Sequence, residues 1–340
     1  MPIVDSDLTE MTHAFVAGTG PGSTSFAYGR DAAGKVTSIG INQLTFEWMP
    51  TLAYTRTYGP ASNMNRIAWV SYAAESRALL WSGDGDLYQE VRTPVGGGAP
   101  VTWTYHYTYG HRLAVVVNNA VSPLTAVYAY DSDDRRTKKV VNGVTTRTMW
   151  SGTDELAEYD VNGDLIRRFI PDGTGSMDQR LATVTPSGVV YWHHADHQGS
   201  VIATSDSNGK TVGTATYSPH GEGAPPAQSP FGYTGRQYDP ETGLYYYRAR
   251  YYSPYLGQFL TRDPIGTKDD PNLYMYVGLD PANATDPTGR CPVCGPAVIG
   301  GVVGGVVGGV AEYLKQRQSG RPIDWGKVRS ETGAGILGGS

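Results

Sequence analysis

The stretch from Tyr128 to Trp150 reads YAYDSDDRRTKKVVNGVTTRTMW, and it decides the fold class. In its last part, NGVTTRTMW, every second residue from Val144 falls on one face of an extended chain, and the residues between them fall on the other. Such alternation is typical of a β-strand. No stretch before residue 297 has a sustained helical period. The pattern therefore predicts strands over most of the chain.

A loose version of this stretch recurs along the sequence. Each unit has an aromatic residue, then Asp or a turn residue, then Gly or Arg, then alternating apolar and polar residues; units begin at Tyr28, Tyr107, Tyr128, Tyr159 and Ser205. The spacing at 160–163 and at 206–209 fits hairpin or type I turns. One such unit cannot bury a face alone, so neighbouring units must stack. We expect an antiparallel β ribbon that winds on itself, with exposed loops at the Gly- and Pro-rich segments 96–100 and 221–230.

The composition agrees with an all-β body. The 340 residues include 24 Tyr against 6 Phe, with 44 Gly and 22 Pro, which favours short strands joined by tight turns. The net charge of −5 and the 17% of charged residues provide no basic field, so no nucleic-acid partner is expected. The N-terminus has no apolar run of Sec signal-peptide length.

The most specific part of the sequence lies between Phe231 and Gly289. FGYTGRQYDPETGLYYYRARYYSPYLGQFLTRDPIG, followed by NLYMYVGLDPANATDPTG, resembles the Rhs repeat-associated core, and the looser units resemble the YD repeats of Rhs proteins. The resemblance implies a β-strand spiral that closes into a hollow shell, as in bacterial Rhs proteins and the similar C components of ABC toxins. It also implies that the shell holds a C-terminal toxin and that the core cuts this toxin free as an intramolecular aspartyl protease.

We therefore expect three parts along the chain: a YD-repeat β-spiral at 1–230, the Rhs core at 231–290, and a Gly-rich helical tail at 291–340. A spiral of this length is too short to close. Its unpaired edge strands would promote aggregation. We expect a further N-terminal Rhs shell portion, or a delivery protein, to cap that edge.

Two Asp-Pro-x-Gly motifs occupy 263–266 and 286–289. Asp, Pro and Gly at these positions are favoured in type I turns, so each motif alone predicts a turn. The resemblance matches Asp263 and Asp286 to the paired catalytic aspartates of the family core. Two carboxylates held close together cannot both ionise easily, so the ionised one can activate water and the protonated one can polarise a carbonyl.

Arg250 is the third candidate catalytic residue. It lies in GLYYYRARYY, which predicts a strand with Arg248 and Arg250 on one face. Arg250 either forms a structural ion pair that holds the shell together, or orients an aspartate and steadies the oxyanion. The two roles are compatible.

By resemblance, the cut falls between Arg290 and Cys291. The family usually has Leu or another apolar residue where this chain has Arg290. Thr267 likewise replaces an apolar residue after the first motif, and Leu279 stands where the family often has Asn.

After Cys291, the tail contains 20 residues, 292–311, that carry no charge. They contain a doubled glycine zipper, formed by Gly300, Gly304 and Gly308 and by Gly301, Gly305 and Gly309. One interpretation is a membrane segment over 292–311 that contacts lipid through 297–311 and helps translocate a toxin. The other is a linker or plug helix packed inside the shell.

Other motifs give weaker indications. HHADH contains His193, His194 and His197. His193 and His197 could share a metal only on a helix, so a structural role is favoured. Cys291 and Cys294 form half a zinc motif with no second half, and they give no disulfide framework. We expect no metal and no cofactor.

Three functions remain open. The first is a shell fragment of a polymorphic toxin, secreted or exposed on the cell surface by a specialised system, that encloses its own C-terminal segment and releases it by one self-cleavage. The second is a non-enzymatic scaffold on the cell surface or wall that binds carbohydrate or neighbouring cells. The third is a displaced remnant with no present activity.

Overall fold

The computed structural model describes residues 10–13, 24–30, 36–41, 55–60, 66–71, 75–172, 178–268, 271–279, 281 and 284–290. Eighteen strands form the first sheet. They are β1 Glu10–His13, β2 Thr24–Arg30, β3 Val36–Ile41, β4 Thr55–Pro60, β5 Ile67–Ser71, β6 Glu75–Trp81, β7 Leu87–Pro94, β8 Val101–Tyr107, β9 Leu113–Asn118, β10 Thr125–Tyr130, β11 Arg136–Val141, β12 Val144–Ser151, β13 Asp154–Tyr159, β14 Leu165–Pro171, β15 Arg180–Val184, β16 Val190–Ala195, β17 Val201–Ser205 and β18 Thr211–Thr214.

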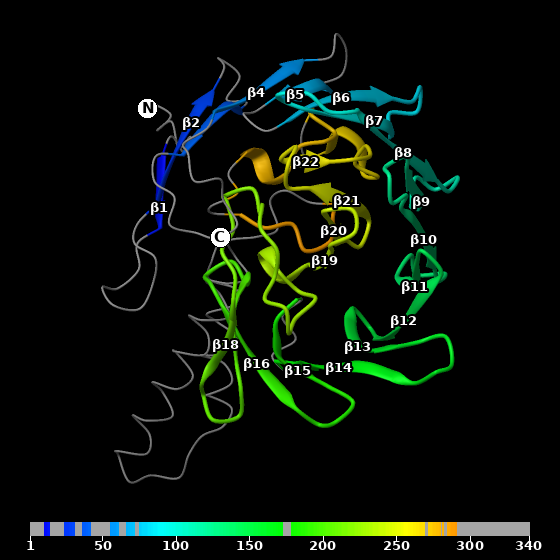
Figure 1. Cartoon of the computed structure of the whole chain (residues 1–340), viewed down its shortest axis with the longest axis vertical. Coiled ribbons are helices and arrows are strands. Elements are labelled where there is room, and N and C mark those ends of the chain that lie inside the picture. The colour runs from blue at the N-terminus through cyan, green and yellow to red at the C-terminus, as the bar shows by residue number, and fades with distance from the viewer. Residues whose placement is uncertain are drawn as a thin grey trace.

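Each strand of this sheet pairs antiparallel with the next strand along the chain. For example, Thr104 of β8 lies opposite Gln89 of β7 and Val117 of β9. The sheet curves as it goes, so that β5 to β18 pass around a central segment of the molecule (Figure 1). The predicted antiparallel all-β architecture is confirmed for the described residues.

In four hairpins of the outer sheet, an aromatic residue fastens one strand to its predecessor. At the end of a strand it donates a hydrogen bond to the carbonyl of the residue that begins the strand before. The bonds of 2.6–3.0 Å run from Trp81 to Ile67, from Tyr107 to Leu87, from Tyr130 to Leu113 and from Trp150 to Arg136. An amphipathic ring fits this position because its body packs while its polar tip is bonded. This contact explains why the repeat uses Tyr and Trp in preference to Phe.

The aspartates of the units at Tyr159 and Ser205 shape the turns that follow them. Asp160 Oδ1 accepts the backbone N–H groups of Asn162 and Asp164, both at 2.8 Å. Asp206 Oδ1 accepts those of Asn208 and Lys210, at 2.9 and 3.0 Å. The turns predicted at 160–163 and 206–209 are confirmed, and each is stabilised by one carboxylate oxygen that bonds the residues two and four positions ahead.

A second, four-stranded sheet lies inside the curve of the first (Figure 1). It consists of β19 Gln237–Asp239, β20 Leu244–Tyr247, β21 Arg250–Ser253 and β22 Gln258–Phe259. Short 3₁₀ turns η1 Tyr233–Gly235, η2 Gly266–Lys268 and η3 Val277–Leu279 flank it. The main hydrophobic core joins the two sheets, because Tyr246, Tyr251 and Leu260 pack among buried residues of β5 to β10 such as Val70 and Val116. The second sheet therefore fills the inner face of the first.

A cluster of tyrosines forms the interior of the central segment. Tyr245, Tyr247 and Tyr252 are fully buried and pack with Tyr233 and Tyr276. Their hydroxyl groups are bonded: for example, Tyr247 lies 2.6 Å from Thr234 Oγ1, and Tyr252 donates to the carbonyl of His220 at 2.9 Å. Buried hydroxyls need such partners, so this core is fixed in one arrangement by polar as well as apolar contacts.

Two expectations about loops need correction. GLYYYRARYY is a hairpin and not one strand: the chain reverses at Arg248 and Ala249, and Tyr247 lies opposite Arg250. Arg248 has a φ of 55°, a left-handed conformation that ordinary turn sequences give to Gly or Asn. The segment 96–100 is exposed as predicted, but much of 221–230 is packed, with the Gly223 carbonyl accepting a hydrogen bond from Tyr245.

The predicted tail lies outside the described residues. Cys291, the glycine zipper and the segment 292–311 all belong to it. Among the residues that the structure does describe, no helix is long and apolar enough to cross a membrane.

Candidate active site

Both Asp-Pro-x-Gly motifs are turns in which an aspartate oxygen accepts a backbone N–H, and Asp286 does so with the same two bonds as the repeat turns. Asp263 Oδ1 accepts the N–H of Ile265 at 3.0 Å, and the Gly266 N–H bonds the Asp263 carbonyl. Asp286 Oδ1 accepts the N–H groups of Thr288 and Arg290, each at 3.2 Å. In Asp286, one carboxylate oxygen thus holds the turn, and the other is directed elsewhere.

Arg250 brings the two motifs together. Its Nη2 lies 2.7 Å from Asp263 Oδ2 and 3.5 Å from Asp286 Oδ2. The guanidinium stacks 3.7 Å above the Phe259 ring, and its side chain is 2% exposed. Burial lowers the pKa of Arg250, and the two aspartates oppose that shift. The three side chains predicted to form a site therefore meet at one guanidinium, 23 residues of sequence separating the two acids.

The second motif is also held by its backbone. Arg250 Nε donates to the Gly289 carbonyl at 2.6 Å, and the Ala249 N–H donates to the Thr288 carbonyl at 3.2 Å. Gly289 has a φ of 67°, and a Cβ added there would lie 2.3 Å from the Tyr247 carbonyl oxygen. Only glycine fits so close to a neighbouring backbone with this conformation. The β20–β21 hairpin is thus hydrogen-bonded to the second Asp-Pro-x-Gly turn, which immediately precedes the predicted cut.

Asp263 borders a cavity of about 310 Å³. The cavity is lined by residues of the β8–β9 turn, the β20–β21 turn and the segment around the first Asp-Pro-x-Gly motif, namely Gly110, His111, Arg112, Ala249, Thr261, Arg262, Asp263, Pro264, Gly266 and Leu273. The Asp263 side chain is 10% exposed, whereas that of Asp286 is 1% exposed. Of the two aspartates, Asp263 is therefore the one that water reaches more readily.

Arg290, the residue before the predicted cut, is half exposed. Its Nη2 lies 3.9 Å from Asp134 Oδ2, and Asp134 also pairs with Arg112. An exposed pair at this distance stabilises little. Cys291, on the other side of the predicted cut, lies outside the described residues.

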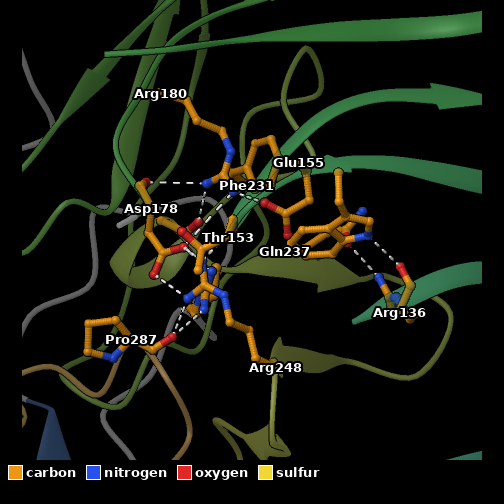
Figure 2. Close-up of polar contacts among 12 residues, drawn as sticks. Arg136, Thr153, Glu155, Asp178, Arg180, Phe231, Gln237, Arg248 and Pro287 are labelled. Atoms are coloured by element: carbon orange, nitrogen blue, oxygen red, sulfur yellow. Dashed lines mark hydrogen bonds and ion pairs between the residues drawn. The ribbon is translucent and has the colours of Figure 1, made fainter. Parts of the chain in front are cut away.

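Three residues beside the site were missed by sequence reasoning: Asp178, Arg236 and Arg248. Figure 2 shows Arg248 bonded to Asp178 and to the Pro287 carbonyl, with the guanidinium of Arg180 between Asp178 and Glu155. Arg236 donates to Asp178 and, at 2.7 Å, to the Pro287 carbonyl. The two arginines in GLYYYRARYY indicated that buried positive charge would need a partner. Nothing local in the sequence indicates that this partner is Asp178.

The histidines of HHADH have structural contacts. His193 Nε2 lies 2.9 Å from Thr183 Oγ1, and His194 Nε2 lies 2.8 Å from Ser205 Oγ. Burial, and secondarily the charge of Arg180, lowers the pKa of His193 to about 4. Within the described ranges, no group of three or more His, Cys, Asp or Glu residues could hold a metal ion.

This pKa predicts a loss of stability in mild acid. An unfolded histidine titrates near 6.5, so as the pH falls from about 6.5 to about 4 the unfolded chain binds a proton that folded His193 does not. The folded state is disfavoured through that window, by at most about 3 kcal/mol. We expect the thermal unfolding midpoint to fall between pH 7 and pH 4.5, and to fall less in His193→Gln. His194→Gln is the matched control and should retain the fall; an equal fall in both variants would contradict the assignment to His193.

The fold and the site define a class of protein: a YD-repeat β-shell of the Rhs type, in which a curved sheet surrounds an arginine- and tyrosine-rich core. A family model described as the Teneurin YD-shell matches residues 102–277. The chain belongs to this family.

Two relatives are similar to about half of this chain. The chain is 34% identical over 198 residues to the tRNA3(Ser)-specific nuclease WapA of Bacillus spizizenii, which covers 55% of the chain and 8% of the relative. It is 29% identical over 202 residues to the toxin protein Tse5 of Pseudomonas aeruginosa, covering 49% of the chain and 15% of the relative. The chain thus spans only a small part of the length of these relatives.

Among solved structures, a chain of the Photorhabdus luminescens Tc holotoxin pore is similar to this protein, and the match covers 80% of this chain and 17% of the toxin chain. The TM-score is 0.46 and the sequence identity is 18%.

Proposed function

We propose that the chain is part of a polymorphic-toxin shell that cuts its own backbone once, between Arg290 and Cys291. The observation that carries this proposal is the convergence of Asp263 and Asp286 on Arg250, beside the turn that ends at Gly289. The family and the relatives named as toxin and nuclease support the toxin context. The chain's own C-terminal segment is the proposed cargo.

The proposed chemistry is hydrolysis of one peptide bond. We assign water activation to Asp263 because it borders the cavity. Asp263 takes a proton from water, and the water oxygen adds to the Arg290 carbonyl carbon. Asp286, in its protonated form, polarises that carbonyl and gives its proton to the nitrogen of Cys291 as the C–N bond breaks. The products are a carboxyl group on Arg290 and an amino group on Cys291.

Arg250 has two roles in this proposal. It holds both carboxyl groups on one guanidinium, and it fixes the peptide unit that precedes the bond to be cut by donating a hydrogen bond from Nε to the Gly289 carbonyl. Its positive charge also stabilises negative charge that develops on the carbonyl oxygen during attack. In this proposal, the contacts that make Arg250 a structural ion pair are also the contacts through which it acts in catalysis.

A proposal for the setting follows from the family. We infer that the shell is secreted or displayed on the cell surface, with further Rhs shell segments or a delivery protein completing it, as its small share of the relatives' length suggests. Contact of 297–311 with a membrane remains a proposal, as does a plug role inside the shell.

The test is to express the whole chain with an epitope at each end and compare native with denaturing separation. We expect two pieces that co-elute on native gel filtration and separate on a denaturing gel, because the cut segment stays enclosed after hydrolysis. A single full-length band on the denaturing gel over days of incubation would overturn self-cleavage and leave the scaffold function as the better account.

A further inference from the structure

The cluster around Asp178 connects the outer sheet to the turn that precedes the proposed cut. Asp178 lies just before β15, and its side chain is 6% exposed. Arg248 Nη2 lies 2.7 Å from Asp178 Oδ1, and Arg248 Nη1 lies 3.1 Å from Oδ2, so the guanidinium is held at both ends of the carboxylate. Arg236 bonds Asp178 Oδ1 as well.

The same two arginines hold the second Asp-Pro-x-Gly turn. Arg236 Nη1 donates to the Pro287 carbonyl at 2.7 Å, and Arg248 Nη1 donates to the same oxygen. Pro287 directly follows Asp286. Two guanidinium groups on one carbonyl oxygen restrict the turn more tightly than a single neutral hydrogen bond.

Asp178 is what keeps these cations together. A third guanidinium, that of Arg180, is bonded to Glu155 and stacks 3.7 Å above the Phe231 ring. Burial, and then the charge of Arg248, lowers the pKa of Arg236 to about 10, while Asp178 opposes that shift. Three guanidinium groups therefore share two carboxylates in a buried space. Without the Asp178 charge, repulsion would move Arg236 and Arg248 away from Pro287.

We propose that Asp178, acting through Arg236 and Arg248, positions the Asp286 turn for self-cleavage, so that the cut takes place only when the outer sheet has docked on the core at Asp178, just before β15. The three residues touch no reacting atom and are positioning residues. They come from three separate parts of the chain: the outer sheet, the segment before β19, and the β20–β21 hairpin. Cleavage is thereby coupled to assembly of the shell around the core. This inference rests on the proposed self-cleavage.

The test uses the whole 340-residue chain made by cell-free translation with a radioactive pulse. The conversion of full-length chain into fragments is followed on denaturing gels, and resistance to trypsin in the same samples measures folding. We expect Asp178→Asn and Arg248→Lys to fold but to be cut roughly 100-fold more slowly, because displacements near 1 Å cost about that factor. A lysine keeps the charge of Arg248 but cannot donate to Asp178 and Pro287 as a planar fork does.

Two further variants separate positioning from general stability. Arg136→Lys changes a more deeply buried arginine, 2% exposed, that contacts Asp239 and Tyr251 but not the Asp286 turn, and its folded fraction should be cut at the normal rate. In Arg248→Ala, added guanidinium ion should restore cleavage, since the Arg248 side chain is 13% exposed and its place is reachable. A purely structural role predicts no such rescue.

The outcomes distinguish the two proposals. If the unchanged chain is never cut, self-cleavage itself is wrong. If the unchanged chain is cut and Asp178→Asn and Arg248→Lys match its rate when folded, self-cleavage stands and the positioning role is refuted. The positioning role would also be refuted if Arg136→Lys slowed cleavage to the same degree and guanidinium did not restore cleavage in Arg248→Ala.

Discussion

Asp286→Asn is expected to slow self-cleavage by about 10²–10⁴-fold, the range typical of removing a general acid or base. Asparagine keeps the oxygen that accepts the N–H groups of Thr288 and Arg290, so the turn persists. It replaces the oxygen that faces Arg250 with an amide, which neither carries charge nor delivers a proton as a carboxyl group does. The measurement is the rate at which full-length chain disappears after synthesis.

The matched control is Asp160→Asn. Asp160 bonds the residues two and four positions ahead in the same way as Asp286, but its turn lies between β13 and β14 and contacts neither Arg250 nor Asp263. The same substitution there should leave the cleavage rate unchanged. Equal rates for the Asp286 variant and the unchanged chain would mean that Asp286 is a turn residue alone.

Asp239→Asn is expected to destabilise the chain by about 3–5 kcal/mol, the usual cost of leaving a buried charge without its partner. Asp239 is fully buried and joins the central segment to β11 through Arg136 at 2.5 Å and Lys139 at 2.8 Å. Burial raises the pKa of Asp239, but the two cations lower it by more, so the carboxylate is ionised in the folded chain. Denaturant unfolding followed by tyrosine fluorescence measures the loss.

Asp133→Asn provides the comparison for an exposed ion pair. Asp133 lies 3.1 Å from Arg135, and its side chain is 67% exposed. Exposed pairs contribute about 0–1 kcal/mol, so this variant should unfold close to the unchanged chain. A similar loss in both variants would contradict the view that the buried Arg136–Asp239 pair holds the core against the outer sheet.

The strands and turns of the outer sheet could be predicted because their signals are local. Alternation from Val144 and the Asp-to-Gly spacing at 160–163 depend on neighbours a few residues apart, and the structure confirms both. The recurrence of aromatic residues was recognised, but the role of Tyr107 was not, because the carbonyl group that it bonds belongs to Leu87 on the preceding strand. The assignment of three parts along the chain stays a prediction, as does everything placed after Arg290.

The site was predictable only in part, for a physical reason. Asp263, Asp286 and Arg250 were selected by resemblance, and the fold brings them together, but their catalytic roles stay a proposal. The hairpin at Arg248 was missed because its turn contains no Gly, Asn or Pro, and ion pairs with Asp178 hold it instead. A contact between residues 70 positions apart leaves no local pattern, so neither the hairpin nor Asp178 could be read from the sequence.

The measurement that tests the central claim most directly is the intact mass of the purified chain after expression. Self-cleavage by the Asp263–Asp286–Arg250 site predicts two masses, one for a fragment that ends at Arg290 and one for a fragment that begins at Cys291. A single mass for the unbroken 340-residue chain, or a cut at any other bond, would contradict it.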